Sequence, residues 1–241
     1  MANKKEKIHP AEKDYQVYKE LERMLEGMRT GYHASDNFEL LMELASISFV
    51  NLVRDEHFDE REKQYLKLIK MVDANTAVAA LSRILKWFHE QGEPRDLLGP
   101  LHSYLGLDYS GSGQFFTPWH IAEMMARMML GSKKDVEATI ADKGYISISD
   151  PTCGAGGMLV AAANVLARYG IDYTKYALFH GVELMPTTAR TAFVQCAIYN
   201  MPAIIVHGNS LNMETFDTFV TAQGHELMHR VDWQSEEKEV V

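Results

Sequence analysis

The chain has 241 residues and an apolar fraction of 46%, enough to bury one large core or two small ones, which excludes wholesale disorder. Its net charge of −9 gives no general attraction to DNA, so any DNA contact needs a local basic face or a basic partner. With two cysteines, a charged N-terminus and no run of about 18 apolar residues, the sequence argues against a disulfide framework and a membrane span and predicts a cytoplasmic protein.

Residues 1–110 are predicted to form a helical domain. Apolar residues recur there at helical spacing in three stretches, which we expect to be buried in the domain's own core. The three stripes are Tyr18, Leu21, Leu25 and Met28; Leu40, Leu41, Leu44 and Ile47; and Val78, Leu81, Leu85 and Phe88. Helix breakers then cluster over residues 92–100 and 108–114, so we place the domain boundary there and assign residues 111–241 to a second domain.

The second domain alternates between helical and extended patterns. Thr117 is predicted as a helix N-cap with Pro118 in the first helical position. The apolar row that follows is interpreted as ordinary core packing and consists of Ile121, Met124, Met125, Met128 and Met129. Strands are predicted at residues 145–150, 177–183, 203–207 and 215–221. One predicted helix lies between the first two strands and contains Leu166, and another begins at Pro186. This order predicts an α/β fold built from right-handed parallel βαβ units.

The turn Asp150-Pro-Thr-Cys-Gly-Ala-Gly-Gly157 is the most informative segment, because it follows a strand and opens a helix. Glycines permit a tight turn and a close approach to a ligand, and the Asp150 carboxylate can accept hydrogen bonds from a ligand ammonium. Glu183 ends the next strand, where a carboxylate binds both hydroxyls of a ribose, and Asn209 ends the third, where it can reach an adenine edge. Together they predict a site for S-adenosylmethionine. An NAD site is the alternative, but the turn lacks the GxGxxG spacing, and there is no GK[ST] of a phosphate-binding loop.

Three segments resemble successive motifs of the N6-adenine DNA methylases. They are Gly113-Gln-Phe-Phe-Thr-Pro118, the turn at residues 150–157, and Gly181-Val-Glu-Leu-Met-Pro-Thr-Thr-Ala-Arg190. Their order, with the first motif ahead of the glycine-rich turn, and the helical region before them resemble the methylation subunit of type I restriction–modification systems. The resemblance covers residues 110–212 well. It implies a class I S-adenosylmethionine-dependent methyltransferase fold with a Rossmann-like sheet.

The resemblance also implies a role for each matching position. Phe116, Thr117 and Pro118 would cover the methionine end of the cofactor, and Glu183 would hold the ribose. The floor under the cofactor would be formed by Asp150, Gly154 and Gly156, and Cys153 and Ala155 of the same turn are also predicted to bind the cofactor. Asn209 stands where the family usually has an aspartate that contacts the adenine, and an amide still offers both a donor and an acceptor.

One motif of that family has no counterpart here. Its members hold a flipped-out target adenine with an Asn/Asp-Pro-Pro-Tyr/Phe tetrapeptide after the fourth strand. This chain contains no Pro-Pro dipeptide and reads Ala222-Gln-Gly-His225 at that place, so we assign no catalytic residue. The family's sheet has seven strands and four are predicted here, so the sheet is expected to be truncated after the fourth. An exposed edge strand there would invite self-association or a partner that completes the fold.

A competing motif lies near the C-terminus. His225-Glu-Leu-Met-His229 fits the HExxH signature of zinc proteases, with Glu226 as the general base. A catalytic zinc site needs a third protein ligand, and no histidine follows His229. We therefore interpret the segment as a terminal amphipathic helix and assign no metal ligand.

Three functions from different classes follow from these patterns. The favoured one is an S-adenosylmethionine-binding protein that resembles site-specific adenine-N6 DNA methyltransferases of type I restriction–modification systems but lacks autonomous catalysis. The first alternative is an active adenine-N6 methyltransferase subunit completed by a partner chain, and the second is a zinc metalloprotease. The resemblance implies DNA as a partner, reached through another subunit, and the exposed edge predicts a homo-oligomer or a hetero-complex.

Overall fold

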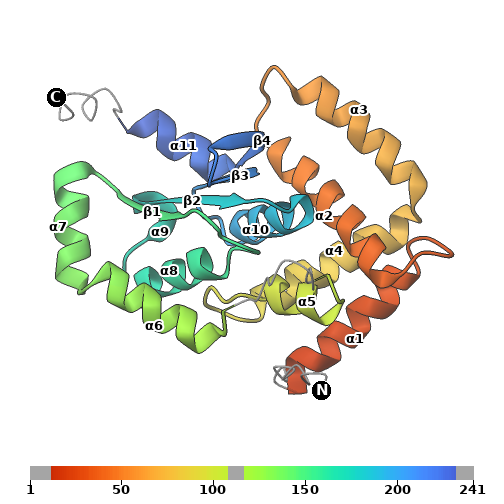
Figure 1. Ribbon diagram of the computed structural model, residues 1–241, viewed down its shortest axis with the longest axis horizontal. Coiled ribbons are helices and arrows are strands. Elements are labelled where there is room, and N and C mark those ends of the chain that lie inside the picture. The colour runs from red at the N-terminus through yellow and green to blue at the C-terminus, as the bar shows by residue number, and fades with distance from the viewer. Residues whose placement is uncertain (1–11, 108–116, 232–241) are drawn as a thin grey trace.

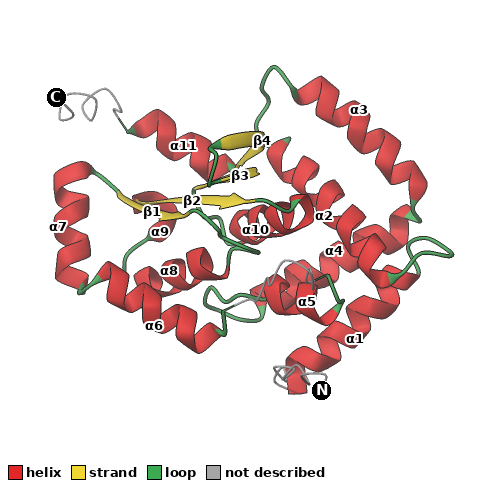
Figure 2. Ribbon diagram, in the orientation of Figure 1, coloured by secondary structure: helices red, strands yellow, loops and turns green. Residues whose placement is uncertain are grey.

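The computed structural model describes residues 12–107 and 117–231 (Figure 1). The helical half lies on one side of the molecule and the sheet with its helices on the other (Figure 2). The elements of the helical half are α1 (Glu12–Glu26), α2 (Ala34–Val50), α3 (Phe58–Leu68), the 3-10 turn η1 (Ile69–Met71), α4 (Ala74–His89) and α5 (Leu98–Tyr104).

Two of the three predicted stripes in this half are buried. All the named side chains of the first and second stripes are at most 7% exposed, and α1 packs against both α2 and α4. Asp73 caps α4 by accepting a hydrogen bond from the backbone N of Thr76 at 2.7 Å. The prediction of a helical N-terminal region is confirmed, because these stripes have the 3.6-residue period of a helix.

The third stripe is only partly buried: Phe88 is buried and Leu81 packs partly buried against the core, but the other two side chains are exposed. Val78 is 59% exposed and Leu85 is 40% exposed. The buried face of α4 is formed by Ala77, Ala80, Ile84, Trp87 and Phe88. This helix carries apolar residues on two faces, and the small alanines allow α1 to approach closely. The spacing of apolar residues alone cannot show which face of α4 is buried, because that depends on where the partner helix packs.

The sheet half alternates strands with helices. Its helices are α6 (Trp119–Leu130), α7 (Lys133–Lys143), α8 (Gly157–Arg168), α9 (Tyr173–Tyr176), α10 (Pro186–Ile198) and α11 (Ala222–Arg230). Its strands are β1 (Ile146–Asp150), β2 (Ala177–Glu183), β3 (Ala203–Asn209) and β4 (Glu214–Val220). The predicted helix start is off by one residue: Pro118 is the N-cap of α6, because its ψ of 139° is extended, and the helix begins at Trp119.

The four strands form one mixed sheet in the order β1-β2-β3-β4. The first three are parallel, with Asp150 opposite Gly181 and Glu183 opposite His207, as the alternation predicts. β4 instead pairs antiparallel with β3. Only residues 210–213 separate β3 from β4, and a parallel crossover needs about a dozen residues or more. A hairpin is therefore the only pairing open to β4, which lies at the edge of the sheet with residues 214–218 exposed.

Helices cover both faces of the sheet (Figure 1). Phe179 and Ile205 face α8 and α10 and belong to the main apolar core. Leu178 and Ile204 point to the opposite face because side chains alternate along a strand, and they pack with Leu227 of α11. Two layers of helices thus cover the two faces of the sheet, and the outer strand β4 stays exposed.

The methionine row of α6 is exposed, which overturns its interpretation as core. Met124, Met125, Met128 and Met129 are between 41% and 75% exposed. α6 instead packs along α8 through Ala122 and Ala126, the two side chains of α6 that are buried. Small side chains let two helices approach closely, and the longer methionines are left on the outer face.

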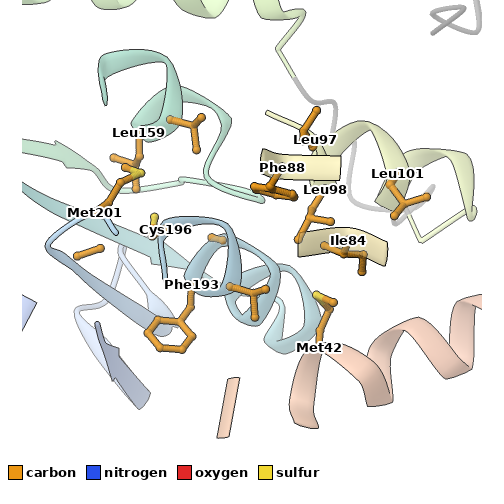
Figure 3. Packing of buried hydrophobic residues seen from close by; sticks show 14 of the residues in the cluster. Met42, Ile84, Phe88, Leu97, Leu98, Leu101, Leu159, Phe193, Cys196 and Met201 are labelled. Atoms are coloured by element: carbon orange, nitrogen blue, oxygen red, sulfur yellow. The ribbon is translucent and has the colours of Figure 1, made fainter. Parts of the chain in front are cut away.

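A single buried apolar cluster runs through both halves of the described chain. Figure 3 shows Phe88 and Leu98 from the helical half in the same buried cluster as Phe193 and Cys196 of α10. α2 also packs against α10. The N-terminal helices therefore contribute to the core that packs against the sheet.

Candidate functional site

The glycine-rich turn between β1 and α8 has the backbone that its sequence requires. Gly154 and Gly156 have φ of 56° and 90°, in the left-handed region that favours glycine. A Cβ on Gly156 would lie 3.3 Å from Cα of Ala192, and one on Gly181 would lie 2.7 Å from Sγ of Cys153. The turn therefore packs directly on α10 and β2, and larger residues cannot replace these glycines without displacing a neighbour.

Asp150 lies at the carboxyl end of β1 and is half-buried. Its Oδ1 accepts a hydrogen bond from the backbone N of Thr152 at 3.0 Å, which closes the first part of the turn. Its other carboxylate oxygen takes no part in that bond. Asp150 thus lies where β1 ends and the turn begins, as the sequence predicts.

Glu183 joins the end of β2 to the turn. It is 8% exposed, its Oε2 accepts a hydrogen bond from Gly154 N at 3.0 Å, and its Oε1 accepts one from Met185 N at 2.9 Å. Burial raises the pKa of Glu183, the nearby charge of Asp150 adds to this, and backbone hydrogen bonds from Met185, Gly154 and Leu184 partly oppose it. The two carboxylates predicted to bind one ligand are therefore close enough to interact.

Asn209 ends β3 at the same edge of the sheet. Its Oδ1 accepts a hydrogen bond from Leu211 N at 3.0 Å, which fixes the start of the hairpin to β4. Several apolar side chains in the neighbouring loops and in β4 are more than half exposed, namely Leu184, Leu211, Met213 and Phe216. Asp150, Glu183 and Asn209 thus follow the carboxyl ends of three adjacent strands, where open α/β sheets bind ligands.

The predicted cover of the site is only partly described. Phe116 lies outside the described residues, Thr117 is exposed and Pro118 is half-buried just before α6. α6 packs on α8, the helix that starts at the glycine-rich turn. The covering role of the segment before α6 stays a prediction.

Cys153 belongs to the floor of the turn. It is buried, and its backbone N donates to Val182 O at 2.9 Å, which fastens the turn to β2. Burial raises the pKa of its thiol, and the charges of Asp150 and Glu183 raise it further. The thiol is therefore neutral and serves packing, and Ala155 beside it is fully buried.

Two residues of this region escaped the sequence analysis. Gln195 of α10 is fully buried, and its Nε2 donates to Ala155 O of the turn at 2.7 Å and to Oδ1 of Asp96 at 3.0 Å. Burial raises the pKa of Asp96, and the hydrogen bonds from Gln195 and Gly99 partly oppose this. A polar glutamine among the apolar residues of α10 could have indicated a buried hydrogen-bonding role. Its partners could not be predicted, because they are distant in the sequence.

The segment in the place of the family tetrapeptide lies away from this site. Thr221 accepts at its Oγ1 from Gly224 N at 3.1 Å and caps α11, so residues 222–225 form the first helical turn. Thr221 N also donates to Ala203 O, the first residue of β3, at 3.0 Å. Because β4 runs antiparallel to β3, the chain leaves β4 at the opposite end of the strands from Asp150, Glu183 and Asn209.

The HExxH histidines lie on α11 as expected of a terminal helix. His225 is half-buried, which lowers its pKa, and Glu226 and His229 are exposed. Across residues 12–107 and 117–231, no three His, Cys, Asp or Glu side chains are grouped so as to hold a metal ion. Nothing in this part of the chain supports the zinc protease.

A hollow of about 370 Å³ lies elsewhere, between α2, α3, α10 and β4. It is lined by charged side chains that include Glu43, Arg61, Arg190 and Asp217, and by none of the predicted cofactor residues.

Among the described helices, none combines the length and apolar character needed to cross a membrane.

Comparisons with known proteins agree with the motif order. Residues 94–236 match the family described as N-6 DNA methylase. The methylase subunit of the type I restriction enzyme StySJI of Salmonella typhimurium is 23% identical over 170 residues, which cover 64% of this chain and 28% of that protein. The corresponding MpnII subunit of Mycoplasma pneumoniae is 27% identical over 128 residues, covering 51% of this chain and 21% of that protein. This chain thus spans about a quarter of the length of the curated relatives it matches.

One solved structure is also similar. It comes from Listeria monocytogenes and is described as a class I S-adenosylmethionine-dependent methyltransferase. It shares 18% identity and covers 80% of this chain and 52% of its own, with a TM-score of 0.44. The fold is defined by the order and direction of β1 to β4 described above.

Proposed function

The chain belongs to the N-6 DNA methylase family, and from that premise we propose that it binds S-adenosylmethionine at the carboxyl edge of β1, β2 and β3. The observation that carries this proposal is the 3.0 Å hydrogen bond from Gly154 N to Glu183 Oε2. It holds a buried carboxylate, suited to a ribose, against the glycine-rich turn. We infer that this bond joins the two parts of the proposed nucleoside site.

The side chains at this edge fit the chemical groups of the cofactor. Asp150 is an acceptor for the ammonium of the methionine part. Each oxygen of Glu183 accepts one backbone N–H and has a further lone pair for a ribose hydroxyl. Asn209 offers an amide to the adenine edge. When bound, S-adenosylmethionine would supply an activated methyl group, and these residues would bind and orient it.

We propose further that the chain does not transfer this methyl group to DNA unaided. The residues in the place of the adenine-binding tetrapeptide are Ala222-Gln-Gly-His225, and they begin α11 at the far edge of the sheet. They offer neither paired prolines nor an aromatic ring to stack on a flipped base. The proposed role is a cofactor-binding module in the cytoplasm, where its two unpaired cysteines would stay reduced.

A second candidate is an active adenine-N6 methyltransferase subunit completed by a partner chain. The exposed apolar side chains around the site favour it, since Leu184, Leu211, Met213 and Phe216 are each at least 51% exposed. Apolar groups exposed together often mark interaction sites. A partner bound there would stand next to the cofactor and would have to supply the contacts to the target base and to DNA.

Isothermal titration calorimetry with S-adenosylmethionine tests the main proposal. Glu183→Ala should weaken binding at least about a hundredfold, because two hydrogen bonds to a charged group of about 1.5 kcal/mol each are lost. Asp150→Ala should also weaken binding strongly, whereas the exposed carboxylate variant Glu226→Ala should bind like the wild type. Absence of binding to the wild-type chain would refute the proposed function.

A methyl-transfer assay on adenine-containing duplex DNA separates the two candidates. The isolated chain should transfer no methyl group from tritium-labelled cofactor to DNA. Transfer that appears only after a copurifying subunit is added would favour the completed enzyme. Transfer by the isolated chain, lost in Glu183→Ala, would refute the inactive module.

A further inference from the structure

The linker between α4 and α5, residues 93–97, is held by side chains from two helices of the sheet half. Asn164 of α8 donates from Nδ2 to Pro94 O at 2.8 Å. The hydroxyl of Tyr199, just after α10, accepts from Arg95 N at 3.0 Å and donates to Arg95 O at 2.8 Å. Backbone groups that would be left unpaired in an irregular buried segment are thus satisfied by the sheet half.

Gln195 connects this linker to the cofactor turn. Its Oε1 accepts hydrogen bonds from Leu97 N and Leu98 N, both at 3.0 Å. Its Nε2 donates to Asp96 Oδ1 and to Ala155 O, the carbonyl between the two left-handed glycines. One fully buried side chain therefore uses both its oxygen and its nitrogen to join the linker and the turn.

Asp96 fills the space behind the start of α8. Its carboxylate is enclosed by two glycines: a Cβ on Gly99 would lie 2.6 Å from Oδ2, and one on Gly157 would lie 2.7 Å from it. Its Oδ1 also accepts from Gly99 N at 3.0 Å. Gly157 is the first residue of α8, where the helix dipole favours a negative group. The carboxylate and the two glycines therefore form one fitted contact between the linker and the turn.

We propose that Asp96 and Gln195 are positioning residues for the cofactor turn, so that the affinity for S-adenosylmethionine depends on the hydrogen bond from Gln195 to Ala155 O and on the Asp96 carboxylate packed at Gly157. The inference rests on the proposed function. The turn contains two residues in the left-handed region, and such backbone is kept in place only when the surroundings determine it. A ligand that binds a turn already held in its bound shape loses less free energy on ordering it.

The coupling runs in both directions. If the contacts of Gln195 and Asp96 with the turn favour cofactor binding, then cofactor binding favours those contacts to the same degree. Adding S-adenosylmethionine should therefore slow amide exchange at Leu97 and Leu98, whose N–H groups bond Gln195 rather than the ligand. A role of Gln195 confined to packing would leave this exchange unchanged.

Gln195→Met against Tyr199→Phe tests the proposal in the full chain. Gln195→Met keeps the side-chain volume but removes every hydrogen bond between the linker and the turn that runs through residue 195. Tyr199→Phe removes both bonds to Arg95 and leaves Ala155 untouched. Calorimetry at low temperature should give about tenfold weaker cofactor binding for Gln195→Met, equal to about 1.4 kcal/mol, and less than about twofold for Tyr199→Phe. Both variants should unfold at lower urea concentration than the wild type.

Asp96→Asn and Asp96→Leu keep the proposal falsifiable if Gln195→Met does not fold. The asparagine retains an acceptor for Gly99 N and Gln195 Nε2, so its affinity should stay within about threefold of wild type, whereas the leucine should lose about tenfold. Equal affinity in wild type, Gln195→Met and Asp96→Leu would overturn this inference and leave the proposed function standing. Equal weakening by Tyr199→Phe and Gln195→Met would also overturn it. No binding by the wild type would refute the proposed function and this inference together.

Discussion

β2 and β4 both flank β3, and both have seven residues, yet they differ in almost every other respect. β2 is joined to β3 through α10, runs parallel to it and has five buried residues out of seven. β4 is joined through residues 210–213, runs antiparallel and buries only Phe219. β2 ends at Glu183, at the proposed site, whereas β4 ends at Val220, at the opposite edge.

The length of the connection explains this difference. A helix such as α10 can carry the chain back across the sheet so that the next strand runs parallel, and a short turn cannot. Each parallel strand therefore adds a side chain to the same edge, and the antiparallel strand adds none. The cofactor residues gather because three strands share a direction, and the segment after β4 is excluded from them because the fourth does not.

Truncating one phenylalanine in each strand tests how unequal the two are. Phe179→Ala in β2 should lower the free energy of unfolding by about 4 kcal/mol, because the ring is fully buried in the main core. Phe219→Ala in β4 should lower it by about 2 kcal/mol, since that ring is 9% exposed on an edge strand and loses mainly its contact with Phe193. Urea unfolding followed by circular dichroism measures both.

The same pair has a second readout at the proposed site. Phe219→Ala should leave the affinity for S-adenosylmethionine unchanged at a temperature where the variant is folded. Equal losses of stability from the two truncations, or weaker cofactor binding in Phe219→Ala, would show that β4 supports the site as much as β2 does.

Alanine substitution in the glycine-rich turn should have the next largest effect. Gly156→Ala should destabilise the fold by about 2 to 3 kcal/mol, because a left-handed backbone is combined with a contact of 3.3 Å to Ala192. Gly144→Ala is the matched control: its φ is 82°, but no atom lies within 4 Å of the added Cβ, so about 1 kcal/mol is expected. Thermal unfolding distinguishes the two, and equal losses would exclude the close packing of the turn on α10.

The pH dependence of binding and stability should isolate Glu183. Burial raises its pKa above the ordinary 4.5, so the folded state favours the protonated form. The stability present below pH 4.5 is lost as the pH rises through the raised pKa, because the unfolded chain gives up its proton first. Cofactor affinity should change in the opposite direction, rising about tenfold per pH unit up to that pKa, since the ribose needs the ionised acceptor.

Glu183→Gln is the control for this titration. It cannot ionise, so the part of both profiles that belongs to Glu183 should disappear. Urea midpoints and calorimetry between pH 4.5 and pH 7.5 provide the data. An affinity profile that is the same in wild type and Glu183→Gln would show that Glu183 does not control the pH dependence of binding.

The smallest effects are expected on α11. Glu226→Ala and His229→Ala should each change the free energy of unfolding by less than about 0.5 kcal/mol, because both side chains are exposed. Added zinc should produce no peptidase activity on a casein substrate. Zinc-dependent cleavage that Glu226→Ala abolishes would reverse the assignment of this helix.

The elements nearest the site could be predicted from the sequence because their requirements are local. The bounds of β2 agree residue for residue with the predicted strand, and α10 begins at Pro186 as predicted, since proline suits the first turn of a helix. Gly154 and Gly156 have the left-handed conformations for which glycine is needed. Asp150, Glu183 and Asn209 lie at strand ends as expected, because the carboxyl ends of parallel strands meet at one edge.

Other features depended on which surfaces meet in space. The buried face of α4, the exposed methionines of α6 and the direction of β4 were each set by a neighbour that periodicity does not reveal. Asp96 and Gln195 are the clearest case, since 99 positions in the sequence separate two side chains whose atoms lie 3.0 Å apart. The turn, the strands and the chemistry at their ends can be predicted from the sequence, because they follow from local backbone and side-chain requirements. The contacts that support the turn and the direction of β4 become visible only in the folded chain, because both depend on segments that lie far apart in the sequence.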